Sequence, residues 1–398
     1  MHILIIEAAL SGHHSGYLER IASAYMEAGH TVTATVLQRD AAHPAIGRLK
    51  SRFSGTFSVL PLEDAKFDAA LQSRLRELGR ELSLRRLFGQ AYRAAHKTKP
   101  VDYVFLPYMD YCLYALGLLG SPFGSTQWGG ICMRPSFHYC HYGVIAPKPK
   151  MANIKRALFL RLLQSKTLKS VYTIDELLHR FVAERHTQWS HRLQYVPDPA
   201  ELNGSHTYES ARQVLGIPDG AVVILVYGAI DGRKGLDVLI AAMSSPEVPT
   251  TLHLLVAGRQ SADIQLLMQS EQAGALMQQG RCHAINSFVD DAMEQMVFAA
   301  TDIVWLGYRN HYTMSGVLAI AAIACKPVIA SKEGLIGWYV QEHALGVVIS
   351  TEMSTVAVRE LIDLLVNRLN KIKIPPIRAH HFTKHSWIYF STTIITSL

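Results

Sequence analysis

Short apolar runs rich in β-branched residues recur along the chain and alternate with stretches of helical periodicity. The runs are continuously apolar, which is typical of strands buried on both faces of a parallel sheet. In the first half they are HILII (2–6), TVTATVL (31–37) and DYVFLP (102–107). In the second half they are AVVILVYG (221–228), TLHLLVAG (251–258), DIVWLG (302–307), KPVIA (326–330) and GVVIS (346–350). The pattern predicts an α/β fold.

Helical segments such as GYLERIASAYMEAGH (16–30) separate these runs, as expected for doubly wound sheets. Pro, Asp, Asn and Gly cluster in YVPDPAELNG (195–204), which indicates a boundary between domains. A chain of 398 residues is long enough for two domains of ordinary size. We therefore expect one doubly wound domain over 1–197 and a second over 198–380.

The composition is that of a soluble globular protein, with 49% hydrophobic and 18% charged residues. No apolar run approaches the ~18 residues that a transmembrane helix needs. The first residues, MHILIIEAALSGHHSG, contain no basic stretch before the apolar run, so we expect a buried strand rather than a signal peptide. The five cysteines have no paired spacing, which favours a reducing compartment and a cytoplasmic protein.

Positive charge is concentrated in the first half of the chain. Residues 1–200 contain 25 Lys and Arg against 15 Asp and Glu, whereas residues 201–398 contain 14 against 17. Residues 147–170 contain seven Lys and Arg and no acidic residue, and helical spacing would place Ile154, Leu158, Leu162 and Leu168 on one apolar face. Such a segment favours an anionic membrane surface, although an amphipathic helix packed on its own domain explains it equally. No nucleic-acid motif or basic tail is present, so we expect no nucleic-acid partner.

The stretch GAIDGRKGLDVLIAA (228–242) places two cations, Arg233 and Lys234, where a strand gives way to a helix. This junction lies at the carboxyl edge of a parallel sheet, where such folds bind ligands. A helix N-terminus there offers unpaired N–H groups, and Gly228 would let a ligand approach the backbone. The stretch predicts a phosphate site, with a solvated basic turn as the alternative.

A second helix start follows the strand DIVWLG, at Ser315–Gly316 in YRNHYTMSGVLAIAAIACKPVIAS (308–331). Ser315 is a suitable N-cap residue. A third loop, VAGRQSAD (256–263), contains Gly258. Two helix N-termini and a lysine at one sheet edge would suit a diphosphate, although neither a Walker loop nor a GxGxxG fingerprint is present.

The order of these motifs over about residues 170–395 resembles the donor domain of GT-B glycosyltransferases, particularly family 4. The resemblance implies two Rossmann-like domains facing across a cleft. The N-terminal domain would bind the acceptor and the C-terminal domain the nucleotide sugar. The tail HSWIYFSTTI resembles the family's closing helix, which implies that 381–398 packs back on the N-terminal domain.

The resemblance also implies roles for single residues. Residues matched to the donor diphosphate are Gly228, Arg233, Lys234, Ser315 and Gly316, and those near the base and ribose are Gly258, Arg259, Asn286 and Phe288. The family's early arginine is replaced by Ala229, for which Arg233 is the substitute. Its Glu-x7-Glu motif is missing, and Tyr312 and Ile320 stand at those positions. Tyr312 thereby becomes a candidate catalytic residue.

The acceptor side is expected in the loop Gly12, His13, His14, Ser15 and Gly16. The family often places a histidine of the N-terminal domain near the reacting sugar, and His138 is the candidate, with His141 second. An ordinary buried or loop histidine is the alternative for His138. The C-x5-H-x-C-H spacing from Cys132 to His141 fits no usual zinc pattern. There is also no Asp-x-Asp motif, so no metal or other cofactor is expected.

These observations predict a glycosyltransferase that moves a sugar from a nucleotide-sugar donor to a lipid-linked or polysaccharide acceptor. The resemblance implies retention of configuration without a metal ion. We expect the protein in the cytoplasm or peripherally on the inner face of the membrane. Two alternatives stay open: a catalytically silent GT-B scaffold that binds nucleotide or glycan for a partner, and another two-domain α/β enzyme such as a sugar-nucleotide epimerase.

Overall fold

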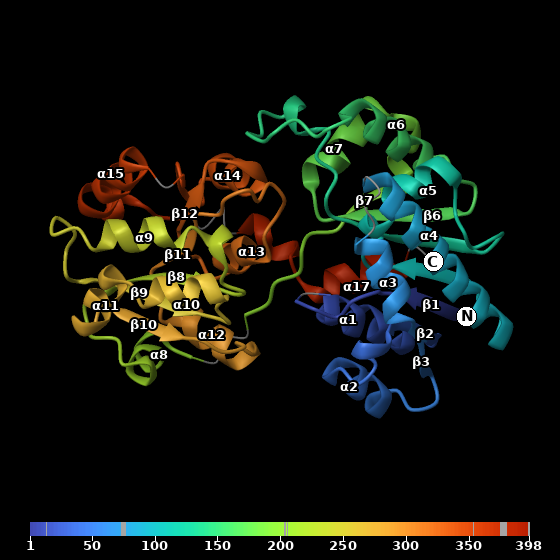
Figure 1. Ribbon diagram of the computed structural model, residues 1–398, viewed down its shortest axis with the longest axis horizontal. Coiled ribbons are helices and arrows are strands. Elements are labelled where there is room, and N and C mark those ends of the chain that lie inside the picture. Colours follow the sequence, from blue (N-terminus) through green and yellow to red (C-terminus); the bar gives the residue numbers. More distant parts are fainter. Residues whose placement is uncertain are drawn as a thin grey trace. The chain divides into compact units, whose positions relative to one another are not determined.

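The computed structural model describes residues 1–12, 14–72, 77–202, 204, 206–352, 354–374 and 380–396. The chain divides into two compact units (Figure 1). Unit 1 comprises Met1–His138, Lys148–Pro197 and Trp387–Leu398, and unit 2 comprises Tyr139–Pro147 and Asp198–Ser386. The chain thus passes from one unit to the other between Pro197 and Asp198, and the segment expected at 381–398 is divided at Trp387.

Unit 1 is built on seven parallel strands in the order β3-β2-β1-β4-β5-β6-β7. The strands are β1 (His2–Ile6), β2 (Thr31–Leu37), β3 (Phe57–Leu62), β4 (Tyr103–Leu106), β5 (Gln127–Cys132), β6 (Leu168–Thr173) and β7 (Leu193–Tyr195). The strand order reverses between β1 and β4. A crevice for ligands is expected at this point, beyond the carboxyl ends of the two strands.

The helices of unit 1 include a C-terminal one that returns to the start of the chain. They are α1 (His14–Glu27), α2 (Pro44–Arg52), α3 (Asp64–Gln72), α4 (Glu77–Thr98), α5 (Leu113–Leu119), α6 (Ala152–Leu163), α7 (Glu176–Arg185) and α17 (Trp387–Thr396). Helix α17 packs on α1, where the Trp387 ring lies 5.5 Å from that of Tyr17 and 4.4 Å from the Arg20 guanidinium. Aromatic and cation–π contacts of this kind fix the helix on unit 1.

Unit 2 repeats the plan with six parallel strands in the order β10-β9-β8-β11-β12-β13. The strands are β8 (Val222–Tyr227), β9 (Leu252–Ala257), β10 (Cys282–Ile285), β11 (Ile303–Leu306), β12 (Val328–Ser331) and β13 (Gly346–Ile349). The order reverses between β8 and β11. The loops after these two strands therefore flank the second crevice at which a ligand is expected.

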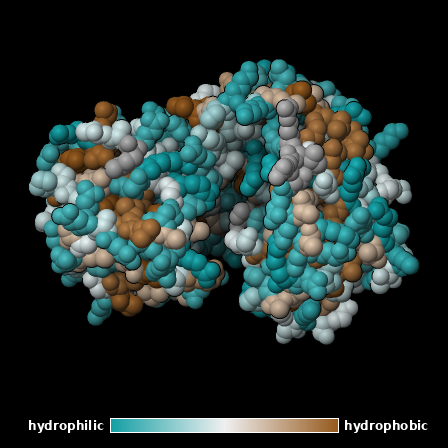
Figure 2. Space-filling view, viewed as in Figure 1, coloured by the Kyte–Doolittle hydropathy of each residue, from teal (hydrophilic) through white to brown (hydrophobic). Residues whose placement is uncertain are grey.

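The helices of unit 2 cover its sheet and bury a continuous apolar core. They are α8 (Tyr208–Leu215), α9 (Leu236–Met243), α10 (Ala262–Met268), α11 (Glu271–Gln278), α12 (Asp291–Ala299), α13 (Gly316–Ile323), α14 (Gly334–Glu342) and α15 (Thr355–Asp363). Leu239 of α9, Leu254 of β9 and Leu361 of α15 are among the fully buried core residues. Figure 2 shows that the visible surface is mostly hydrophilic, with hydrophobic residues in separate patches.

The predicted α/β class is confirmed, because the eight apolar runs quoted above form strands in two parallel sheets. Within the described residues, every helix is too short or too polar to cross a bilayer. One expectation for 147–170 is wrong. Helix α6 ends at Leu163 and Leu168 begins β6, so Leu168 cannot share a helical face with Ile154.

Candidate functional site

The junction between β8 and α9 is a tight turn shaped by glycine. Gly228 follows the strand with a φ of +98°, and Gly235 precedes α9 with a φ of +63°. A Cβ on Gly235 would lie 2.3 Å from the backbone oxygen of Gly307, beyond the end of β11. Only glycine fits there, because both the backbone angle and the contact exclude a side chain. The loops after β8 and β11 are thereby held together at the point where the strand order reverses.

Lys234 lies in this turn with a buried side chain. Its Nζ donates hydrogen bonds to the backbone oxygen of Tyr227, 2.9 Å away, and to the Tyr308 hydroxyl. The ammonium also lies 4.1 Å from the centre of the Tyr308 ring. An ammonium group has three donors, and these contacts use two of them. Lys234 therefore presents a fixed positive charge at the carboxyl end of β8, with one donor left for an anion.

Arg233 and Arg309 are both paired with carboxylates in the structure. The exposed Arg233 guanidinium lies 2.6 Å from Asp231, which also accepts the Arg233 backbone N–H at 3.0 Å. Arg309, which the sequence interpretation missed, lies after β11 and donates to Asp237 at 2.9 Å. Its backbone N–H donates to the Arg233 oxygen at 2.7 Å. Among these three neighbouring cations, Lys234 is the one for which the described residues provide no carboxylate partner.

The loops after β8, β9 and β10 are also joined to one another. A Cβ on Gly258 would lie 1.8 Å from the Gly228 oxygen, so the two loops touch backbone to backbone. Asn286 accepts the backbone N–H of Gln260 at 2.9 Å, which gives its side chain a structural role in the loop. Arg259 and Phe288 are exposed, and Phe288 retains 78% of its accessible surface. These two remain available to a ligand such as a nucleotide base.

Helix α13 begins at Gly316, with Ser315 at the N-cap position. The Ser315 side chain makes no capping hydrogen bond, in contrast to the expectation from sequence. A Cβ on Gly316 would lie 3.1 Å from a carboxylate oxygen of Asp198, so a negative charge already lies beside this helix start. Carboxylates are favoured at helix N-termini for the same reason as phosphates. A donor phosphate at this position would have to displace or share the site of Asp198.

Tyr312 lies in the loop between β11 and α13, with its hydroxyl 3.3 Å from the Asn310 side-chain oxygen. Burial and the neighbouring Glu333 raise its pKa, so the phenol is neutral at physiological pH. The backbone oxygen of Tyr312 accepts the N–H of Leu335 at 3.0 Å. The loop is thereby fixed against the start of α14. Ile320 is half-buried within α13.

In unit 1, His14 begins α1 and lies beyond the end of β1. Its Nδ1 is 3.2 Å from a carboxylate oxygen of Glu7, and its ring is 4.8 Å from that of Tyr108. Glu7 is almost completely buried, and burial raises its pKa against the effect of His14. Because β1 and β4 flank the reversal of strand order, this pair lies where the first sheet would bind a ligand. The sequence interpretation included His14 and missed Glu7.

The remaining residues of the expected acceptor loop have local contacts. Gly12 has a φ of +62°, and its oxygen accepts the Ser15 hydroxyl at 3.3 Å. Gly16 lies within α1, and a Cβ there would meet no atom within 4 Å. His13 lies outside the described residues.

His138 is completely buried, and its Nε2 lies 3.0 Å from Asp175. Asp175 also accepts the backbone N–H groups of Leu177 and Leu178 and so caps α7. This arrangement holds the imidazole in the interior of unit 1. His138 is therefore placed as the alternative expected, an ordinary buried histidine. His141 is exposed in unit 2.

Comparison with known proteins assigns a large part of unit 2 to a protein family. Residues 207–374 match the family described as Glycosyl transferases group 1, a range that includes Lys234, Tyr308 and Ser315. Residues 207–374 therefore form a glycosyltransferase group 1 domain, and the chain as a whole has the GT-B fold. No curated protein matches its sequence.

Solved structures with the same fold span the whole chain. Sucrose-phosphate synthase from Thermosynechococcus elongatus is 16% identical with a TM-score of 0.65, and the match covers 100% of this chain and 98% of that one. HepE from Anabaena in complex with UDP is 16% identical with a TM-score of 0.66 over 100% of both chains. WaaG, a glycosyltransferase involved in lipopolysaccharide biosynthesis, is 17% identical with a TM-score of 0.58 over 98% of this chain and 95% of its own.

Proposed function

We propose that this glycosyltransferase belongs to family 4 and transfers a sugar from a nucleotide-sugar donor, held by unit 2, to a glycan or lipid-linked acceptor. The observation that carries the proposal is the buried ammonium of Lys234, fixed by Tyr227 and Tyr308 within the group 1 domain. HepE has been solved with UDP and with UDP-glucose, which makes uridine nucleotides the first donors to test.

The proposed chemistry uses Lys234 to stabilise the departing nucleoside diphosphate. Negative charge develops on the bridging oxygen as the bond from the sugar to the phosphate breaks. A fixed ammonium lowers the energy of that charge without reorganisation. With retention, the acceptor oxygen forms the new bond on the face that the diphosphate leaves, and its proton passes to the departing phosphate. This route needs neither a carboxylate nucleophile nor a metal ion, so it accommodates Tyr312 and Ile320 at the family's glutamate positions.

A catalytically silent scaffold is the second candidate. It is favoured by the loss of the family's early arginine at Ala229 and by the pairing of Arg233 with Asp231, which neutralises the expected substitute. Such a protein would bind a nucleotide or glycan without turnover. Nucleotide binding alone therefore does not separate the two candidates, and transfer has to be measured as well.

The first experiment is thermal unfolding with UDP, GDP, ADP, TDP and CMP. A ligand at about 100 times its Kd stabilises the folded state by about 2.7 kcal/mol, which gives a readable shift. We expect one nucleoside diphosphate to stabilise the wild type and Lys234→Met to lose that shift. Lys373→Met removes an exposed lysine of unit 2 and serves as the matched control. Equal shifts in the wild type and both variants would rule out Lys234 as the diphosphate ligand.

Turnover then tests the reaction itself. Release of the nucleoside diphosphate from a matching nucleotide sugar, dependent on an added acceptor, supports a transferase. Binding without release favours the silent scaffold. NMR of the new glycosidic linkage reports retention or inversion, and activity after chelation of divalent ions tests the proposal that no metal is needed. Epimer formation without an acceptor would identify the third class of enzyme.

We also propose that the protein works peripherally at the cytoplasmic face of a membrane. A lipid-linked acceptor would be presented there, and the cation-rich segment 147–170 would favour an anionic bilayer. The likeness to WaaG, involved in lipopolysaccharide biosynthesis, agrees with such an acceptor class.

A further inference from the structure

Helix α6 is buried at one end and exposed at the other. Phe159 and Leu163 are completely buried, and a Cβ on Gly117 of α5 would lie 2.1 Å from the Leu158 oxygen, so the C-terminal half is packed tightly on unit 1. At the N-terminal end, Met151 and Ile154 retain 59% and 50% of their accessible surface. The apolar face predicted from sequence is thus covered only in part.

Met151 is unusual for its position. It is the N-cap residue of α6, has a φ of 59° and makes no side-chain capping bond. Left-handed backbone favours glycine or asparagine, and N-caps favour small polar residues. The sequence has a large apolar side chain here against both preferences, and the folded unit leaves it exposed. Packing within unit 1 therefore does not account for Met151.

Exposed apolar residues and cations lie together at this end of the helix. Met151, Ile154, Ala157 and Arg161 recur at spacings of three or four residues and are all exposed, which defines one stripe along α6. Lys148 and Lys150 precede it and are exposed. Lys155 is engaged by Glu77 of α4 at 2.7 Å, and residues 147–170 contain no acid of their own.

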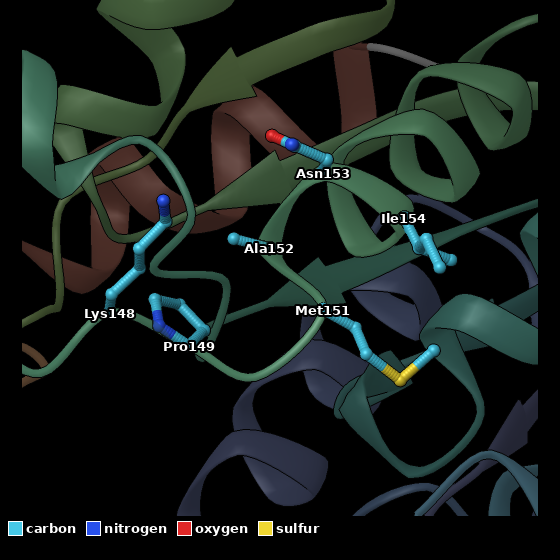
Figure 3. Close-up of a pocket in the computed structure, with 6 residues that line it drawn as sticks. All are labelled: Lys148, Pro149, Met151, Ala152, Asn153 and Ile154. Atoms are coloured by element: carbon cyan, nitrogen blue, oxygen red, sulfur yellow. The ribbon is translucent and has the colours of Figure 1, made fainter.

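An open pocket lies at the same place, lined by Lys148, Pro149, Met151, Ala152, Asn153 and Ile154 (Figure 3). In Figure 3 the side chains of Met151 and Ile154 extend toward one side of the loop, and those of Lys148 and Asn153 toward the other. Two exposed apolar side chains beside exposed lysines match a bilayer interface, where acyl chains meet anionic headgroups. An acidic protein would satisfy the lysines but would not require Met151 and Ile154.

We infer that the surface formed by residues 148–161, here called the α6 surface, docks on anionic lipid bilayers with Met151 and Ile154 inserted among the lipids. The inference gives the proposed peripheral association a location and does not depend on glycosyl transfer. Neither a donor nor an acceptor is needed for the protein to bind a vesicle.

The test is co-sedimentation of the full chain with vesicles of phosphatidylcholine alone or with about one third phosphatidylglycerol. We expect binding to the anionic vesicles that falls with added salt. Lys148→Gln/Lys150→Gln should weaken it about 25-fold, since each cation near the bilayer contributes a factor of about five. Met151→Ser/Ile154→Ser should weaken it comparably, because both apolar side chains are lost.

Leu266→Ser is the matched control, because Leu266 of α10 in unit 2 retains 70% of its accessible surface. It should bind vesicles like the wild type. Unchanged melting temperatures and nucleotide shifts in all variants would show that folding and the donor site are intact, so a loss of vesicle binding is separable from a failure of the proposed function. The inference is overturned if the wild type ignores anionic vesicles at low salt, or if either double variant binds like the wild type.

Discussion

The Lys234 ammonium donates a hydrogen bond to the backbone oxygen of Tyr227, 2.9 Å away, at the last residue of β8. The strand that positions the lysine thus also fixes its charge. Tyr227 is fixed in turn, because its hydroxyl donates to Glu294 at the start of α12. Burial and the neighbouring Glu294 carboxylate raise the pKa of Tyr227, so its phenol keeps its proton at physiological pH. The cation proposed to bind the donor is therefore held by β8, by α12 through Tyr227, and by Tyr308 in the loop after β11.

The first prediction concerns the second support of Lys234. Tyr308→Phe removes the hydroxyl that accepts from the ammonium and keeps the ring beneath it. We expect the Kd for the matching nucleoside diphosphate to rise about tenfold, because hydrogen bonds to charged groups contribute about 1.5–3 kcal/mol. Titration calorimetry measures this. Tyr208→Phe, which loses a surface bond to Asp302, is the control and should bind normally. An unchanged Kd in Tyr308→Phe would mean that Tyr227 alone positions the lysine.

The second prediction tests the contact between the loops after β8 and β9. In Gly258→Ala the Cβ would lie 1.8 Å from the Gly228 oxygen, and the φ of +141° adds backbone strain. We expect the free energy of unfolding to fall by about 3 kcal/mol, with loss of nucleotide binding as the loops separate. Gly280→Ala has a positive φ but open space around its Cβ, so it should cost only about 1 kcal/mol. Urea denaturation of both variants measures the difference, and equal losses would contradict the steric argument.

Apolar runs were enough to predict the fold class and eight strands, but other strands were missed for physical reasons. Strand β5 reads QWGGIC because it is crowded: a Cβ on Gly129 would lie 2.3 Å from the Tyr103 hydroxyl, and one on Gly130 would lie 2.5 Å from the Leu106 oxygen. Small residues required by neighbouring strands weaken the apolar signal. Strand β3 lies at an edge of its sheet and contains Pro61, a residue typical of edge strands.

Residues of the candidate site could be predicted where a local sequence pattern marks them. They could not be predicted where they reach the site only through the pairing of strands that are distant in sequence. Lys234 was found because a lysine follows a strand and precedes a helix. Tyr308 and Arg309 join it only because β11 lies beside β8, which no local pattern reveals. Glu7 was hidden at the end of an apolar run. Conversely, the sequence around His138 does not reveal that this histidine is buried, because its partner Asp175 lies 37 residues away.

The third prediction is a pH dependence of stability in unit 1. Glu81 of α4 is buried and accepts the backbone N–H groups of Tyr114 and Ala115, yet burial dominates and raises its pKa from 4.5 to about 7. The folded state thus binds a proton that the unfolded state loses above about pH 4.5. Its contribution to stability is complete below that pH and is lost as the pH rises through about 7, by at most about 3 kcal/mol.

Urea unfolding of the wild type and Glu81→Gln across this pH range checks the prediction. Glutamine can accept the same N–H groups but does not ionise, so the variant should show a flatter stability profile. Glu63→Gln replaces an exposed carboxylate and should keep the wild-type profile. Parallel profiles for the wild type and Glu81→Gln would show that Glu81 does not titrate in this range.

The fourth prediction separates the two units by their ligands. His14→Gln removes the imidazole held 3.2 Å from Glu7 at the strand reversal of unit 1. If this pair positions the acceptor, kcat/KM for the acceptor should fall about tenfold to a hundredfold. The nucleotide-induced thermal shift should not change, because Lys234 and its supports all belong to unit 2.

Glu7→Gln should act in the same direction, since the imidazole then loses its charged partner. His191→Gln, at an exposed position of unit 1, is the control. A His14→Gln enzyme with normal acceptor kinetics would exclude the loop from acceptor binding, and a parallel loss of nucleotide binding would point to a general structural defect.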